Sequence, residues 1–221
     1  MRPTEYVLNP LYWAGMAQLN LLVDLPGALV HTPREHRHHA LLQAAGIYDA
    51  QLPQAQKFWQ VFSEFRPAHC SGDIGDQRFW QQIIARVGLD DCDIAEAIAA
   101  DTDAGSWLDT EAWGCIESLA DAGIPIAGTA NCSLSQSQHL RQQYPCLEEL
   151  DALVLSCDIG VVLPDERMLH VAVDALGASV RETVFISTNE GHLAAAAELG
   201  MRARLYMGVG QLCELVEQAT G

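Results

Sequence analysis

Several polar side chains stand at or just after the ends of short apolar runs, where a fold can gather them into one site. Asp24 lies near the end of the first run, Asn131 follows the second, and Ser187 and Asn189 follow the fourth, with His192 three residues further on. A carboxylate can transfer protons when its environment suits the reaction, and a histidine titrates near neutral pH. We therefore take Asp24 and His192 as candidate catalytic residues, and Asn131, Ser187 and Asn189 as candidate ligand-binding residues.

The apolar runs predict the elements that must position these side chains. Runs of this length without polar alternation are typical of strands covered on both faces of a parallel sheet. Helical patterns over residues 110–122, 165–176 and 192–199 separate them. This alternation of strands and helices along the chain predicts a doubly wound parallel α/β sheet with ligands at the carboxyl ends of its strands. The runs cover residues 20–25, 124–128, 153–157, 183–187 and 203–206.

The stretch after the first run contains no convincing strand. Its apolar residues recur at helical intervals, as in Phe58, Val61, Phe62 and Phe65. We predict an all-helical cap over residues 32–105, inserted into a core formed by residues 1–31 and 106–221.

The charge balance excludes several classes of partner. The 221 residues carry a formal net charge of -17, and Lys57 is the only lysine. Such a chain has no basic surface with which to bind nucleic acid or an anionic membrane. Because residues 1–10 lack a secretory signal pattern and no apolar run is long enough to span a bilayer, we expect a cytoplasmic protein.

The seven cysteines and the histidine-rich segment predict no metal site. The cysteines are widely spaced with no C-x-x-C pair, which favours reduced thiols packed as small apolar groups. His36 and His39 fall on one helical face, but no cysteine or acidic residue lies at a suitable local spacing to complete a zinc site. We expect a solvated face there.

Four segments in register resemble the motifs of the haloacid dehalogenase (HAD) superfamily, and the inserted helices resemble the cap of its subfamily I. Residues 21–30 place Asp24 at the first Asp of the pattern Asp-x-Asp-Gly-Thr, and residues 123–131 end in the Asn of the second motif. Residues 161–165 resemble a segment that ends Lys-Pro-Asp, and residues 184–189 resemble an acidic pair followed by Asn. The resemblance implies a Rossmann-like HAD core with a helical cap.

The same resemblance implies that most of the family's working side chains are missing. In the family the first Asp attacks phosphorus, the second protonates the leaving group, a Ser or Thr and a Lys hold the phosphoryl group, and an acidic pair helps to hold magnesium. Loss of a general acid costs about 10²- to 10⁴-fold in rate, and Asp24 alone is a poor magnesium site. We expect no cofactor, weak or absent Mg²⁺ binding and little or no phosphatase activity. The degenerate motif positions are Pro26, Ala28, Ala130, Leu163, Ser187 and Thr188.

Three interpretations follow. In the first, the chain is a HAD-fold pseudoenzyme that binds a small molecule or a protein partner around the old cleft. In the second, it resembles the metal-independent 2-haloacid dehalogenases, with Asp24 as nucleophile and His192 as base. In the third, it is a lyase, isomerase or biosynthetic enzyme that uses Asp24 as acid or base, because a carboxylate facing Leu163 and Ala130 with no cation beside it is poorly solvated.

Overall fold

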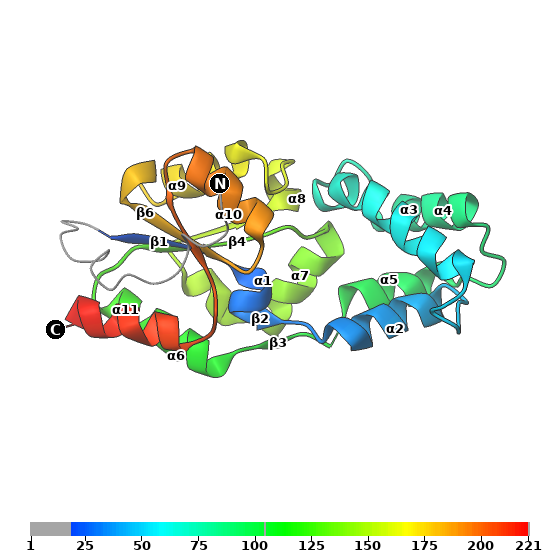
Figure 1. Ribbon diagram of the computed structural model, residues 1–221, viewed down its shortest axis with the longest axis horizontal. Helices are drawn as coiled ribbons and strands as arrows, with labels where there is room; N and C mark the ends of the chain where they lie inside the picture. The colour runs from blue at the N-terminus through cyan, green and yellow to red at the C-terminus, as the bar shows by residue number, and fades with distance from the viewer. Residues whose placement is uncertain (1–18, 104, 221) are drawn as a thin grey trace.

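The computed structural model describes residues 19–103 and 105–220 (Figure 1). Residues 1–18, where the predicted core begins and where a secretory signal would lie, are outside this description. Within the described residues, five strands form a parallel sheet in the order β5-β4-β1-β6-β7. The predicted α/β class is confirmed. The strands are β1 (Asn20–Asp24), β4 (Ile126–Ala130), β5 (Ala152–Leu155), β6 (Thr183–Ser187) and β7 (Arg202–Leu205).

Helices cover both faces of this sheet, as a doubly wound fold requires. Leu21 and Val23 of β1 pack into one apolar cluster with α6 (Thr110–Asp121) and α11 (Gly210–Thr220). Leu22 faces the other way, into a cluster with α9 and α10. Figure 1 shows α6 and α11 on one side of the strands and α9 and α10 on the other. The remaining core helices are α7 (Leu134–Gln143), α9 (Glu166–Ala175) and α10 (Glu190–Glu198), with short 3₁₀ turns at Pro145–Glu149 and Val180–Glu182.

The central position of β1 fixes where its last residue lies. Val23 is in register with Ile186 of β6, and Asp24 is in register with Thr129 of β4. Because the strands are parallel, their carboxyl ends meet at one edge of the sheet. The residues that follow β1, β4 and β6 therefore lie near one another.

Three predicted strand boundaries are wrong by two residues. The second strand begins at Ile126 and not at residue 124, and it ends at Ala130 and not at residue 128. The preceding Pro125 has no backbone N–H, and its carbonyl accepts from the N–H of Leu21. The third strand ends at Leu155, and residues 156–157 belong to the short helix α8 (Ser156–Ile159). Cys157 is therefore not part of a strand.

Between β1 and β4 the chain forms a helical insertion. A short turn, α1 (Leu25–Ala28), leads into β2 (Val30–His31), and the chain returns through β3 (Trp107–Leu108). Val30 pairs with Leu108, so the two connections run side by side as an antiparallel ribbon. Within residues 32–103 the insertion forms four helices, one more than the sequence pattern indicates. They are α2 (Arg34–Ala44), α3 (Pro53–Cys70), α4 (Asp76–Val87) and α5 (Ile94–Thr102).

The helical insertion has its own apolar cluster, which includes fully buried Phe58, Phe79, Trp80 and Ile83. It lies to one side of the sheet in Figure 1, beyond α7 and α8. Among residues 19–103 and 105–220, no helix combines the length and the apolar character needed to cross a membrane.

Candidate functional site

Asp24 ends β1 with its carboxylate buried; the residue is 3% exposed. Its Oδ2 atom accepts a hydrogen bond from Ser187 Oγ at 2.6 Å and lies 2.7 Å from Nδ1 of His192. The structure thus brings together three of the residues singled out in the sequence. The expectation that Asp24 has no potential cation beside it is wrong, because the imidazole of His192 is within hydrogen-bond distance.

Ser187 and Asn189 position this contact. Ser187 is the last residue of β6, next to β1 in the sheet, and its Oγ also accepts from the backbone N–H of Asn189 at 3.0 Å. Asn189 caps α10, where its Oδ1 accepts from the N–H of Gly191 at 2.8 Å and of His192 at 3.3 Å. An amide at this position satisfies the free N–H groups of a first helical turn. Both side chains therefore orient His192 toward Asp24.

Asn131 makes a different structural connection. Its Nδ2 donates to the carbonyl of Leu163 and its Oδ1 accepts from the N–H of Leu163, both at 2.8 Å. Leu163 is 3% exposed and packs in the cluster that includes Leu22 and Phe185. These two hydrogen bonds hold the loop after β4 against the loop after α8. Both the oxygen and the nitrogen of the Asn131 amide already have a hydrogen-bond partner in the protein.

The turn after β1 packs against the residue that follows Ser187. Thr188 Oγ1 donates to the carbonyl of Pro26 at 3.3 Å. Gly27 has a φ of 82°, and a Cβ built there would lie 2.7 Å from Thr188 Oγ1. Ala28 is fully buried beneath the turn. The backbone of this turn thus follows a path that only glycine allows at position 27.

The side chains around Asp24 do not fit magnesium. Mg²⁺ requires hard oxygen ligands in a near-octahedral arrangement, and Asp24 Oδ2 is already engaged with Ser187 and His192. Asp158 is held by Arg141 at 2.8 Å, and Glu190 is exposed on the first turn of α10. Within residues 19–103 and 105–220, no three His, Cys, Asp or Glu side chains are grouped so that they could hold a metal ion.

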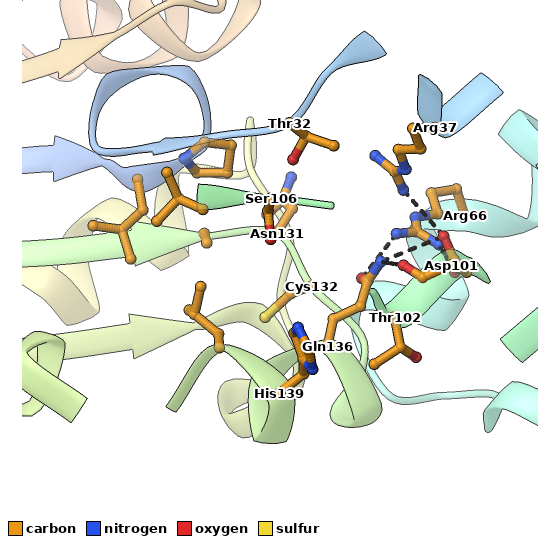
Figure 2. A pocket seen from close by; sticks show the side chains of 15 residues that line it. Thr32, Arg37, Arg66, Asp101, Thr102, Ser106, Asn131, Cys132, Gln136 and His139 are labelled. Carbon is orange, nitrogen blue, oxygen red and sulfur yellow. Dashed lines mark hydrogen bonds and ion pairs between the residues drawn. The ribbon is translucent and has the colours of Figure 1, made fainter. Parts of the chain in front are cut away.

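A cavity of about 180 Å³ lies between the turn after β1 and the helical insertion. Leu25, Pro26 and Ala130 form its apolar wall on the core side, and Thr32, Ser106 and Asn131 add polar groups. Figure 2 shows Ser106 and Asn131 close together, with Arg37 and Arg66 facing them from the insertion. Asp24 is not one of the residues that line this cavity. We refer to this space as the core cavity.

An ionic network on the insertion side of the core cavity was not predicted from the sequence. Asp101 accepts from Arg37 Nη2 at 3.0 Å and from Arg66 Nη1 at 2.5 Å, and Gln136 of α7 accepts from Arg66 Nη2 at 2.8 Å. Burial alone would raise the pKa of Asp101, but the two guanidinium groups outweigh it and hold that pKa below its usual range. The side chain of Asp101 is 3% exposed.

The sequence contained a partial signal for this network. Arg66 follows Phe58 and Phe62 at intervals of four residues, which places it on the buried face of α3, and Asp101 follows Ala97 in the same way on α5. A charge on the apolar face of a helix requires a partner. The identity of that partner depends on how α2, α3 and α5 pack, which periodicity alone does not define.

Comparison with known proteins places this geometry in context. No protein-family model matches the sequence, and no curated protein matches it. Solved structures do match: a HAD-family enzyme of Bacteroides thetaiotaomicron in complex with magnesium and inorganic phosphate has a TM-score of 0.67 at 18% identity, covering 86% of this chain and 93% of that one.

Two further matches agree in fold. A predicted HAD-like hydrolase of Porphyromonas gingivalis has a TM-score of 0.63 at 19% identity, covering 86% of this chain and 91% of that one. The L-2-haloacid dehalogenase of Xanthobacter autotrophicus, with chloropropionic acid covalently bound, has a TM-score of 0.59 at 17% identity, covering 84% of this chain and 76% of that one. Together with the parallel sheet and its helical insertion, these matches show that the chain has the fold of the HAD superfamily.

Proposed function

We propose that this protein is a HAD-fold pseudoenzyme that binds a small molecule in the core cavity and does not hydrolyse phosphate esters. The observation that carries the proposal is the separation of Asp24 from the cavity. The carboxylate is 3% exposed and bonded to Ser187 and His192, whereas the cavity wall beside it is formed by Leu25 and Pro26.

The composition of the cavity supports binding. Small-molecule sites combine mostly apolar walls with a few polar groups that fix the ligand's orientation. Here Pro26 and Ala130 occupy positions at which the resemblance implies a general acid and a hydroxyl, and Leu163 occupies the position of a lysine. We propose that residues 32–105 act as the cap over this site, and that residues 1–31 and 106–221 form the core beneath it.

Saturation-transfer NMR with a panel of small organic acids, amides and amines tests the binding site. We expect Ser106→Phe to lose binding of the compounds that occupy the core cavity of wild type, because the half-buried Ser106 lines that cavity, and Asp24→Asn to keep it. With p-nitrophenyl phosphate and Mg²⁺, wild type should turn over no faster than Asp24→Asn. Turnover well above that of the variant would disprove the pseudoenzyme.

A second function is favoured by the contact between His192 and Asp24. In a metal-free hydrolase, an Asp24 oxygen would attack the carbon of a 2-haloacid, forming a C–O bond as halide leaves with the electron pair of the C–halogen bond. Water would then add to the ester carbonyl carbon and give one proton to His192. The bond between that carbon and the ester oxygen would break, the leaving 2-hydroxy acid oxygen would take the proton back from His192, and the regenerated carboxyl group of Asp24 would release its remaining proton to solvent. The similarity in fold to an L-2-haloacid dehalogenase motivates this candidate.

The buried state of Asp24 makes the hydrolase the second choice. The enzyme would need its nucleophile in the cavity, but the described cavity does not include it. Halide release from 2-chloropropionate, measured for wild type and Asp24→Asn, decides between the two functions. Release that Asp24→Asn abolishes establishes the hydrolase, and a halide signal equal in both proteins rejects it.

A further inference from the structure

The two arginines of the ionic network differ in their partners. Arg37 and Arg66 share one carboxylate, and each oxygen of Asp101 is bonded to one of them. Arg66 also donates to Gln136, and its Nη1 lies 3.4 Å from Nδ1 of His69, whose Nε2 is 2.8 Å from a carboxylate oxygen of Asp76. Among the described residues Arg37 is paired with Asp101 alone, so it is the arginine of this network that can take a further anion.

Arg37 also has an unused donor. Its Nε atom is buried and has no hydrogen-bond acceptor among the described residues. A buried donor without an acceptor costs free energy because it has lost its hydrogen bonds to water. The side chain as a whole is 31% exposed, so a ligand can reach it from the surface.

A second cavity, of about 370 Å³, opens beside this network between α2 and α3; we call it the insertion cavity. The side chain of Arg34 lines it and forms no ion pair or hydrogen bond with any residue in the described part of the chain. His38, also on the wall, has its pKa lowered by burial and then by the positive charges of Arg34 and Arg37. In a chain with a net charge of -17, this cavity is locally cationic.

Apolar and aromatic side chains also line the insertion cavity. They are Leu41 of α2 and Trp59 and Phe62 of α3, and the rings of His38 and Trp59 lie 4.3 Å apart at an interplanar angle of 35°. A flat ring can pack against these side chains while a planar anion reaches the arginines. Guanidinium groups match carboxylates in geometry, with two parallel hydrogen bonds available.

We propose that the insertion cavity binds an aromatic carboxylate, with the carboxylate on Arg37 and Arg34 and the ring against Trp59 and Phe62. This is a second site beside the one in the proposed function: Thr32, Arg37 and Arg66 line both cavities, but the aromatic carboxylate occupies the insertion cavity and not the core cavity. A ligand bound through Arg37 in the insertion cavity therefore borders directly on the core cavity.

Benzoate and benzamide, which have nearly the same shape but differ in charge, are the probes for this site. We expect isothermal titration to show benzoate binding to wild type about tenfold or more tightly than benzamide, the effect of a charge-assisted hydrogen bond. Arg37→Gln should reduce benzoate affinity by about the same factor. Arg167→Gln is the matched control, since Arg167 is 70% exposed and paired only with nearby Asp165, and it should bind as wild type does.

A second pair of variants separates the two cavities. Ser63 lines only the insertion cavity and Ser106 only the core cavity, so Ser63→Phe should abolish benzoate binding and Ser106→Phe should preserve it. If Arg37→Gln does not fold, Arg34→Gln replaces it, because Arg34 makes no polar contact with a described residue.

Four outcomes would overturn the inference. Equal affinity for benzoate and benzamide, or an unchanged affinity in both Arg37→Gln and Arg34→Gln, would show that the arginines do not hold the anion. If Ser106→Phe alone removes binding, the inference fails and the proposed core-cavity function stands. If neither Phe variant alters binding of benzoate or of any compound in the NMR panel, both fail.

Discussion

His192 Nδ1 lies 2.7 Å from Asp24 Oδ2, although 168 positions separate the two residues in the sequence. The contact joins the end of β1 to the first turn of α10. Asn189 sets the start of that turn, and Ser187 donates to the same carboxylate oxygen. The side chains that would surround a reacting group therefore satisfy one another instead.

A double-mutant cycle measures how strongly Asp24 and His192 interact. Hydrogen bonds to a charged group contribute about 1.5–3 kcal/mol, and both side chains are largely buried. We expect a coupling of about 1–3 kcal/mol between Asp24→Asn and His192→Ala, from urea unfolding of the four proteins at pH 7. Additive effects of the two changes would mean that the pair does not interact in solution.

Asp101→Asn should be strongly destabilising at neutral pH. It leaves the partly buried guanidinium groups of Arg37 and Arg66 without their buried carboxylate, and breaking a buried pair in this way costs about 3–5 kcal/mol. Asp165→Asn serves as the control: it removes a half-buried carboxylate paired with Arg167, but asparagine can still cap α9, so the melting temperature should change little. A similar small effect for both variants would contradict the buried network.

The same network predicts the sign of an acid transition. The pKa of Asp101 is lower in the folded chain than its ordinary value of 3.8, so the unfolded chain binds the proton more readily. The stability that Asp101 contributes is complete well above about pH 4 and is lost as the pH falls below that value toward the folded pKa. Urea unfolding between pH 6 and pH 2 should show the stability difference between wild type and Asp101→Asn shrinking with acid. A difference that is constant over this range would contradict the lowered pKa.

Two cysteines should differ widely in alkylation rate. A hydrogen bond from Cys132 is the largest cause that lowers the pKa of Cys157 to about 7, whereas burial and the neighbouring Cys213, with its Sγ at 3.1 Å, raise the pKa of Cys115 to about 12. Because the thiolate is the reactive form, iodoacetamide at pH 7.5 should label Cys157 first and Cys115 far more slowly. Peptide mapping by mass spectrometry over time reports both rates in one sample. Equal rates would show that the thiols do not have these environments.

Gly27→Ala should destabilise the turn after β1 for two separable reasons. A φ of 82° costs a residue with a Cβ about 1–2 kcal/mol, and the new Cβ would lie 2.7 Å from Thr188 Oγ1. Thr188→Ala removes the close approach but not the cost of the dihedral angle. We expect the double variant to recover part of the lost free energy of unfolding, measured in urea. If the double variant recovers all of the lost free energy of unfolding, the backbone at position 27 must relax. If it recovers none, Thr188 must move aside without cost in the single variant.

The sheet could be predicted from sequence because its strands are covered on both faces. Buried parallel strands give uninterrupted apolar runs, and β1 and β6 matched such runs to within a residue. The end of β5 could not be predicted in this way. There the Ser156 hydroxyl donates to the Cys70 carbonyl and accepts from the N–H of Cys132, and these contacts depend on tertiary packing.

The sequence indicated where the candidate site residues lie better than how they interact. Asp24, Ser187 and Asn189 were expected near one another because they follow neighbouring strands, and the structure places them there. Their mutual hydrogen bonds depend on side-chain direction, which spacing does not give. The ionic network around Asp101 was missed because its partners come from α2, α3 and α7, and the packing of these helices cannot be read from periodicity.

The ribbon formed by β2 and β3 has a consequence for protein engineering. Because His31 and Trp107 are already in register on neighbouring antiparallel strands, the two cut ends left by deleting residues 32–106 would lie as close as the arms of a tight β-hairpin. A two-residue Asn-Gly linker could join them without changing the direction of either arm. Leu25, Val30 and Trp113 pack in a cluster that contains no residue of the deleted segment. The topology thus offers a direct route to a shortened chain in which the sheet can be studied alone.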